Sequence, residues 1–185
     1  PGVPRELEYL MKRRVIPYLK ERVGTSSLIK AKILRTCVIG ESQIDALIGD
    51  LMIGGTPTVG LAAHSGQVDI RITAKAADEA EADSLIAPLE AELRDRLGSV
   101  IYGEGSEELQ EKVGRLLDER GLTLALADTV TQGEVAERLI NTPYSDVLVS
   151  NEVPAGEGGN SEGAQTEAER LAQNVRADAG SSLGL

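Results

Sequence analysis

Residues 58–73, TVGLAAHSGQVDIRIT, carry the pattern that decides the fold of the first half of the chain. Val68, Ile70 and Ile72 alternate with polar residues, which is the period-two pattern of a half-buried strand. Residues 58–63 form an earlier extended run, and His-Ser-Gly-Gln between the two runs supplies turn-forming residues. The stretch therefore predicts a β-hairpin with one apolar face.

The segments on either side of this hairpin extend it to a small domain. Before it, Ile29, Ala31 and Ile33 alternate with two lysines and predict another half-buried strand. Residues 44–51 and 85–97 each place apolar side chains on one helical face. The order strand–helix–strand–strand–helix (βαββα) predicts an α+β domain with its helices on one face of the sheet.

Two prolines fall inside predicted helices. Residues 5–22 have apolar residues at helical spacing, and Pro17 is expected to interrupt that helix, since proline has no N–H and clashes with the preceding turn. Pro88 is expected to kink or split the helix over residues 85–97 for the same reason.

The second half of the chain alternates helices and strands. A helix over residues 107–120 is followed by the apolar run 122–127, which is typical of a parallel strand covered on both faces. A helix over residues 134–141, a strand at 147–149 and a helix over 166–179 come next. This alternation predicts a three-layer α/β domain, which we expect to be incomplete.

Composition restricts the class of protein. The formal net charge is −11, so phosphate backbones would not bind by charge alone, and we expect no nucleic-acid partner. The single cysteine, Cys37, excludes an internal disulfide and favours a reducing compartment. No apolar run approaches the roughly 20 residues that span a bilayer, and no metal or cofactor motif is evident. We expect a cytoplasmic protein without a membrane partner.

Three stretches in the same order resemble proteins of the CinA family (competence/damage-inducible protein A). Residues 1–7, PGVPREL, resemble the loop that closes that family's molybdopterin-binding-like N-terminal domain. Residues 36–42, 57–59 and 68–74 resemble its α+β middle domain, and residues 107–127 resemble the entry to its C-terminal amidohydrolase domain.

This resemblance implies three segments. Residues 1–26 would be the tail of the N-terminal domain and a connector, residues 27–104 the α+β middle domain, and residues 105–185 a degenerate, truncated amidohydrolase-like domain. The chain would thus be a fragment that lacks most of the N-terminal domain. The family's N-terminal domain is associated with ADP-ribose pyrophosphatase activity and its C-terminal domain with nicotinamide mononucleotide deamidation, so the resemblance implies a nicotinamide-nucleotide ligand. Proteins of this family also dimerise, so the resemblance implies a homo-oligomer.

The catalytic motif implied by the family is altered in this chain. The family reads Ala-Glu-Ser-Cys-Thr-Gly-Gly, whereas residues 127–133 read ADTVTQG. The motif-equivalent candidates are therefore Asp128, Thr129, Thr131 and Gly133, with Thr129 at the position of the nucleophilic serine. The family's later Ser-Asn-Glu-Ala-Lys motif corresponds to residues 150–154, SNEVP, so proline replaces the lysine.

The composition of the C-terminal segment, without any comparison to the family, also indicates that a general base is missing. After Lys112 the chain contains no Lys, His or Cys, so a Ser–Lys, Ser–His or Cys–His pair cannot form within this segment. Ser150, Asn151 and Arg138 remain as candidate ligand-binding residues. Glycines at 156–159 lack the following Lys-Ser or Lys-Thr of a phosphate-binding loop and indicate a connector.

Three hypotheses about function stay open. The amidohydrolase-like domain has lost catalysis and serves ligand binding or assembly; it remains a nicotinamide mononucleotide amidohydrolase that uses Thr129 and a base from elsewhere; or the chain is a structural or dimerisation module. The middle domain is also similar to KH modules, but it has no Gly-x-x-Gly loop flanked by basic residues and no stacking aromatics. The altered motif and missing lysine favour the first or third hypothesis.

Overall fold

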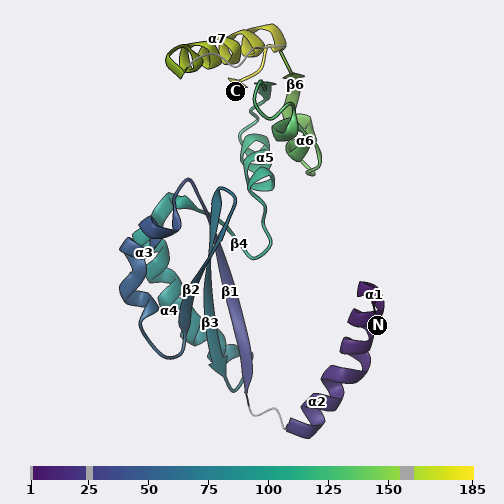
Figure 1. Cartoon of the computed structure of the whole chain (residues 1–185), viewed down its shortest axis with the longest axis vertical. Helices are drawn as coiled ribbons and strands as arrows, with labels where there is room; N and C mark the ends of the chain where they lie inside the picture. Colours follow the sequence, from purple (N-terminus) through teal and green to yellow (C-terminus); the bar gives the residue numbers. More distant parts are fainter. Residues whose placement is uncertain (1, 24–26, 155–160) are drawn as a thin grey trace. The chain divides into compact units, whose positions relative to one another are not determined.

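The computed structural model describes residues 2–23, 27–154 and 161–185. The chain divides into two compact units, Pro1–Gly105 and Ser106–Leu185 (Figure 1). The fold is mixed, with an antiparallel sheet in the first unit and a parallel sheet in the second. Each unit is described by itself below.

The first unit contains a four-stranded antiparallel sheet in the order β2-β3-β1-β4. Its strands are β1 (Leu28–Cys37), β2 (Thr58–His64), β3 (Gln67–Ala76) and β4 (Ile101–Glu104). The predicted hairpin is confirmed: β2 and β3 pair from His64↔Gln67 onward through a two-residue turn in which Gly66 has a φ of 73°. The short strand β4 was not predicted, because four residues are too few to show a period.

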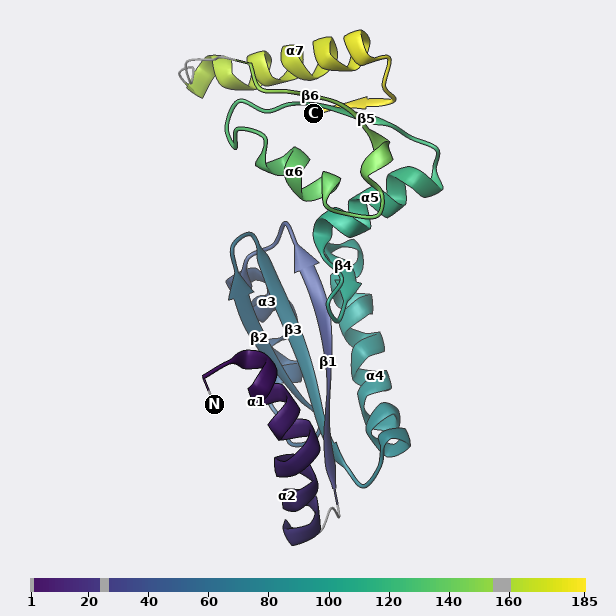
Figure 2. The same ribbon diagram turned by 90° about the vertical axis from the view of Figure 1, so that its right-hand side faces the viewer.

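Two helices cover one face of this sheet, α3 (Glu41–Ile48) and α4 (Glu79–Leu97), with the 3₁₀ turn η2 (Gly49–Met52) after α3 (Figure 2). The buried hydrophobic residues between sheet and helices are all aliphatic. The most buried of them come from both layers: Leu34, Ile44, Ile48, Ile70, Ile72, Ala74, Ala82 and Leu93. The alternation in residues 68–72 therefore marks the buried face of β3 correctly.

The buried face of β1 is the opposite of the one its alternation indicates. Ile29 is 72% exposed, whereas Lys30 and Lys32 are turned toward α4. The pairing register explains this, since Leu34 and Thr36 lie opposite buried residues of β3 and share a face with both lysines. A strand has only two faces, so burying Leu34 and Thr36 places the lysines on the helix side.

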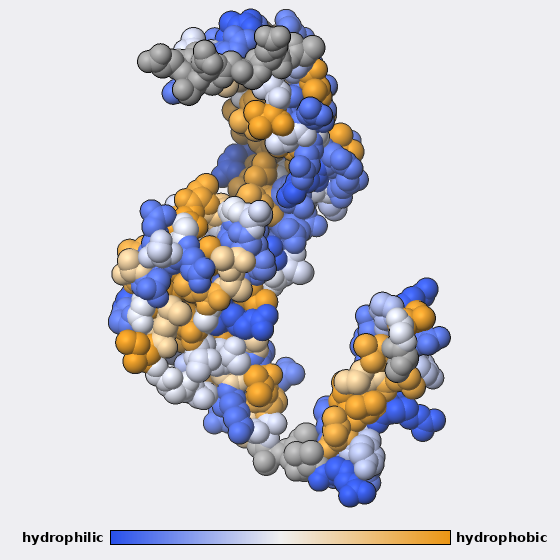
Figure 3. Space-filling model, viewed as in Figure 1, coloured by the Kyte–Doolittle hydropathy of each residue, from blue (hydrophilic) through white to orange (hydrophobic). Residues whose placement is uncertain are grey.

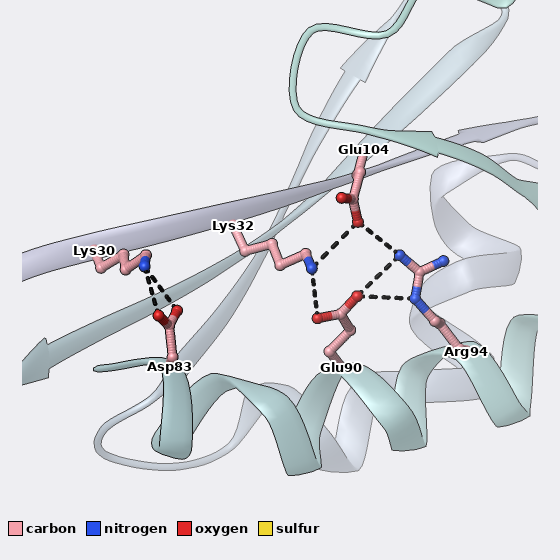
Figure 4. A network of polar contacts seen from close by, with 6 residues as sticks. All are labelled: Lys30, Lys32, Asp83, Glu90, Arg94 and Glu104. Atoms are coloured by element: carbon pink, nitrogen blue, oxygen red, sulfur yellow. Dashed lines mark hydrogen bonds and ion pairs between the residues drawn. The ribbon is translucent and has the colours of Figure 1, made fainter. Parts of the chain in front are cut away.

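Acidic residues compensate the inward-facing lysines (Figure 4). Lys30 Nζ lies 2.7 Å from a carboxylate oxygen of Asp83, and Lys32 Nζ lies 2.8 Å from Glu90 and 3.2 Å from Glu104. Arg94 bridges the same two glutamates at 2.9 and 3.0 Å. The aliphatic stems of the lysines cover the sheet while their charged ends are paired.

The two predictions about prolines have different outcomes: the helix around Pro88 is not split, whereas the regular α-helix of the N-terminal segment is interrupted just before Pro17. Helix α4 is continuous through Pro88, which is exposed, so the Ser84 carbonyl that lacks an amide partner faces water. The N-terminal segment is helical through Pro17, as α1 (Pro4–Leu10), a π-helical turn η1 (Met11–Val15) and α2 (Ile16–Val23). The π turn ends at Val15, two residues before Pro17, so the departure from regular α-helix lies next to the proline, as predicted.

The apolar side chains of this N-terminal helical segment are exposed. Figure 3 shows them along the helix, and they include Leu7, Leu10, Met11, Val15, Ile16 and Leu19. Each is between 37% and 48% exposed. The helix predicted for residues 5–22 is confirmed. Within the described residues, none of the side chains of α1 and η1 is buried.

The second unit contains a parallel sheet in the order β6-β5-β7. Its elements are α5 (Leu109–Glu119), β5 (Leu124–Ala127), α6 (Glu134–Ile140), η4 (Ser145–Val147), β6 (Leu148–Glu152), α7 (Ser161–Ala179) and β7 (Leu183–Gly184). Helix α7 packs against all three strands, while α5 and α6 form a core with β5 on the other face (Figure 2). The predicted three-layer arrangement is confirmed. The glycines at 156–159 lie outside the described residues.

Candidate functional site: the loop after strand β5

The loop of residues 128–133 leaves the carboxyl end of β5 and leads into α6. In open α/β sheets, ligands bind at the carboxyl ends of the strands, where the strand order reverses. Here β5 lies between β6 and β7, and the following helices α6 and α7 lie on opposite faces of the sheet. The loop therefore occupies the position at which this fold class places its ligands.

Asp128 organises the loop through its carboxylate. Oδ1 accepts hydrogen bonds from the backbone amides of Val130 at 3.1 Å and Thr131 at 2.7 Å. Oδ2 accepts the Gly133 amide at 2.9 Å and the Thr131 hydroxyl. Three amides of the loop thus point at a side chain of the same loop.

These contacts determine the acidity of Asp128. The hydrogen bond from the Thr131 hydroxyl, helped by the backbone amides of Thr131, Gly133 and Val130, lowers the pKa of Asp128 to about 2. The carboxyl group is consequently ionised at neutral pH. A general base needs a pKa near the working pH, so Asp128 is poorly suited to that role.

The backbone bends sharply at the end of the loop. Gln132 has a φ of 56° and Gly133 a φ of 96°, both in the left-handed region that favours glycine. The family resemblance implies a glycine at position 132. This chain has glutamine there, but its backbone still adopts the left-handed conformation. This turn is what brings the Gly133 amide back to Asp128.

Thr129, the position that corresponds to the nucleophile, lies exposed at the tip of this loop. Within the described residues its hydroxyl makes no hydrogen bond. An activated hydroxyl needs a base within hydrogen-bond reach, about 2.6–3.2 Å. The geometry described gives Thr129 no such partner.

The candidate ligand-binding residues are brought together only in part. Asn151 in β6 lies opposite Leu126, and its Nδ2 would lie 3.8 Å from a Cβ placed on Gly133. Ser150 is half-buried and lies opposite Ala125. Asn151 and Gly133 thus meet at the edge of the sheet where the loop begins.

Arg138 is engaged elsewhere. It lies on the exposed surface of α6, where its Nη2 is 2.6 Å from Oε1 of Glu134, one turn earlier. Its charge is therefore balanced within the helix, which weakens the expectation that it binds an anion.

The network around Asp128 was not predicted from the sequence. The signal was present, because an Asp or Asn side chain commonly accepts the amides two and three residues later. Reading residues 128–131 as such a turn would have shown that the loop amides already have an acceptor.

The geometry has one chemical consequence. Loop amides that point into an empty space can stabilise a developing oxyanion, but those of Val130, Thr131 and Gly133 are bonded to Asp128. Among the described residues, no group of three His, Cys, Asp or Glu is placed to hold a metal ion. No described helix is both long and apolar enough to cross a membrane.

Residues 31–103 match the family described as "Damage-inducible protein CinA KH domain". The chain is also 46% identical over 154 residues to a competence-damage inducible protein of Clostridium perfringens (strain SM101 / Type A), which covers 83% of this chain and 37% of the relative. A protein of the same name from Clostridium botulinum (strain 657 / Type Ba4) is 45% identical over 144 residues, 77% of this chain and 35% of the relative.

The chain belongs to the CinA family. It spans little more than a third of the length of the relatives that it matches.

Proposed function

We propose that the second unit of this CinA-family chain is a non-catalytic amidohydrolase-like domain that serves ligand binding or assembly in a protein of pyridine-nucleotide recycling. One observation carries the proposal: the carboxylate of Asp128 accepts the amides of Val130, Thr131 and Gly133. A substrate oxyanion would have to displace an ionised side chain that is bonded to its own loop.

The absence of a base supports the same conclusion. Hydrolysis of a carboxamide by a hydroxyl nucleophile needs a group that takes the proton of that hydroxyl. The segment after Lys112 contains no Lys, His or Cys, and Pro154 stands where the family resemblance implies lysine. The carboxylate next to Thr129, that of Asp128, is a weak base with a pKa of about 2.

A ligand can still bind at this edge of the sheet. Asn151 lies beside Gly133 and offers an amide group that both donates and accepts hydrogen bonds. Such a group suits the carboxamide of a nicotinamide nucleotide. Binding there needs neither an oxyanion site nor a base.

Ammonia release from nicotinamide mononucleotide tests the proposal. The assay uses the protein in its natural full length, beside its Thr129→Ala variant and an amidohydrolase of established activity as positive control. We expect no release above the blank from either form. Release that disappears in Thr129→Ala would instead establish Thr129 as a nucleophile.

Calorimetric titration of the same nucleotide separates ligand binding from assembly. Binding that is weakened about tenfold by Asn151→Ala, the loss expected for one or two hydrogen bonds, would support a ligand-binding domain. If the nucleotide does not bind, the domain serves assembly alone.

A further inference from the structure

Strand β2 forms one edge of the antiparallel sheet, and its outer side is free. The strand order β2-β3-β1-β4 gives β2 a neighbour on one side only (Figure 2). Among the described residues, no backbone hydrogen bond joins β2 to a segment other than β3. The free edge therefore runs along the whole strand, which has seven residues.

The hairpin turn shows which backbone groups point to this edge. His64 and Gln67 pair with each other across a two-residue turn, so they exchange both backbone hydrogen bonds. Bonding alternates along an antiparallel strand, so every second residue of β2, counted back from His64, also bonds to β3. The N–H and C=O groups of Val59, Leu61 and Ala63 therefore point outward, and the described residues offer them no backbone partner.

The common protection of such an edge is missing from β2. Natural edge strands usually carry charged side chains, above all lysine, or proline within the strand. Residues 58–63 read TVGLAA and contain neither. An edge of this kind can accept a further strand, with main-chain hydrogen bonds supplying affinity and pockets for alternate side chains supplying selectivity.

A groove of about 550 Å³ lies beside this edge, on the helix side of the sheet. It is lined by Glu41, Ser42 and Asp45 of α3, Met52 of η2 and Leu61 of β2. Residues directly opposite each other on neighbouring strands have their side chains on the same face. A residue opposite Leu61 would therefore direct its side chain into the groove.

The groove has the charge and lining that suit a long basic side chain. Glu41 and Asp45 lie one turn apart on α3, a spacing at which like charges repel each other. Neither carboxylate makes a hydrogen bond or ion pair with a described side chain. Met52 and Leu61 add apolar surface, against which the stem of a lysine or arginine can pack while its charged end reaches a carboxylate.

We propose that β2 binds an extended segment of another protein as an additional strand, with a lysine or arginine of that segment opposite Leu61. The main chain of the segment bonds to the outward groups of Val59, Leu61 and Ala63. Its basic side chain occupies the groove beside Glu41 and Asp45. The inference is independent of the chemistry proposed for the second unit.

The same charges disfavour other occupants of this edge. A second copy paired through β2 would bring two α3 helices, and with them two pairs of carboxylates, to the same face of the joined sheet. Residues 58–63 carry no cation to offset those carboxylates. A nucleic acid would meet the same repulsion through its phosphates.

Fluorescence anisotropy with two labelled peptides tests the proposal on the full-length protein. The probe is Thr-Thr-Val-Arg-Val-Thr-Thr, and its counterpart has glutamate in place of arginine. We expect the arginine peptide to bind about tenfold more tightly, because its charge is paired in the groove, and we expect added salt to reduce the difference. Equal binding of the two peptides, or binding of neither, overturns the proposal.

Two variants separate the groove from the strand edge. The double variant Glu41→Gln, Asp45→Asn should remove the preference for arginine, whereas Asp118→Asn, at an exposed carboxylate of the second unit, should retain it. Ala63→Pro removes an outward N–H and no bond to β3, so the arginine peptide should bind about tenfold more weakly. Ala63→Ser keeps the N–H and is the matched control. A preference for arginine that Ala63→Pro leaves unchanged would mean binding without an added strand, and overturns the proposal.

Hydrogen exchange resolved to single amides gives the answer even if Ala63→Pro does not fold. The arginine peptide should slow exchange at Val59, Leu61 and Ala63, whose amides gain a partner. Exchange at Gly60 and Ala62, whose amides already bond to β3, should change little. Slower exchange that is confined to α3, or spread evenly over the protein, overturns the proposal.

Discussion

Both carboxylate oxygens of Asp128 bind groups of its own loop, two backbone amides at Oδ1 and an amide and a hydroxyl at Oδ2. A side chain used in this way fixes the course of the chain from β5 into α6. It also accounts for the positive φ of Gln132, since a less sharp turn would carry the Gly133 amide away from Oδ2. The residue therefore acts as the structural centre of the loop.

Replacing Asp128 by asparagine is expected to lower the thermal stability of the second unit at neutral pH. The amide has only one accepting oxygen, so at least one loop amide loses its partner. The depressed pKa of Asp128 also sets a pH dependence: its stabilisation is present above the ordinary value of 3.8 and is lost as the pH falls toward 2. Thermal unfolding between pH 2 and 7 should show this step in the wild-type chain and not in Asp128→Asn.

Asp146→Asn is the control for this prediction. Asp146 is an exposed aspartate of the same unit that makes no hydrogen bond or ion pair with a described residue. The control should retain the wild-type profile. Identical profiles for wild type and Asp128→Asn would refute the role assigned to Asp128.

At the level of elements, the sequence indicated where strands and helices lie better than which face of them is buried. The hairpin of β2 and β3 follows from local alternation, and it formed as predicted. The buried face of β1 depends instead on Leu34 and Thr36, whose partners across the sheet are distant in sequence. Alternation in residues 28–33 shows two faces but carries no information about which one meets α4.

The approach of α5 to η4 depends on a glycine and gives a second prediction. A Cβ on Gly114 would lie 2.8 Å from Tyr144 Cβ and 3.2 Å from Leu139 Cδ1. Gly114→Ala should destabilise the second unit by about 1–3 kcal/mol, the usual range for overpacking, although alanine favours a helix by up to about 1 kcal/mol. Urea unfolding measures the difference.

The control for Gly114→Ala is Gly60→Ala. A Cβ on Gly60 in β2 meets no atom within 4 Å, and its φ is not positive. Its stability should stay within about 0.5 kcal/mol of wild type, as for other changes at open positions. A stabilised Gly114→Ala protein would mean that α5 does not approach Tyr144 this closely.

For the whole molecule, the sequence was informative about class and order of elements and less so about chemistry. The altered loop after β5 was recognisable because residues 127–133 depart from a family motif. The proximity of Asn151 to Gly133 and the ion pair between Arg138 and Glu134 could not be predicted, since they depend on how β6 and α6 are placed. The free edge of β2 was equally hidden, because it follows from the order of the strands in the sheet.

Each unit has its own hydrophobic core, the first around Ile70 and Ile72 and the second around Leu126 and Leu139. Units with separate cores are expected to unfold separately, so a change in one core should leave the other unaffected. Ile70→Val, at a fully buried position, should lower the stability of the first unit by about 0.5–1.5 kcal/mol. Gly114→Ala should lower the stability of the second unit only.

Hydrogen exchange followed by mass spectrometry reports on both units in one experiment. Faster exchange confined to the substituted unit would support separate unfolding, whereas a parallel increase in both would show that the chain unfolds as one.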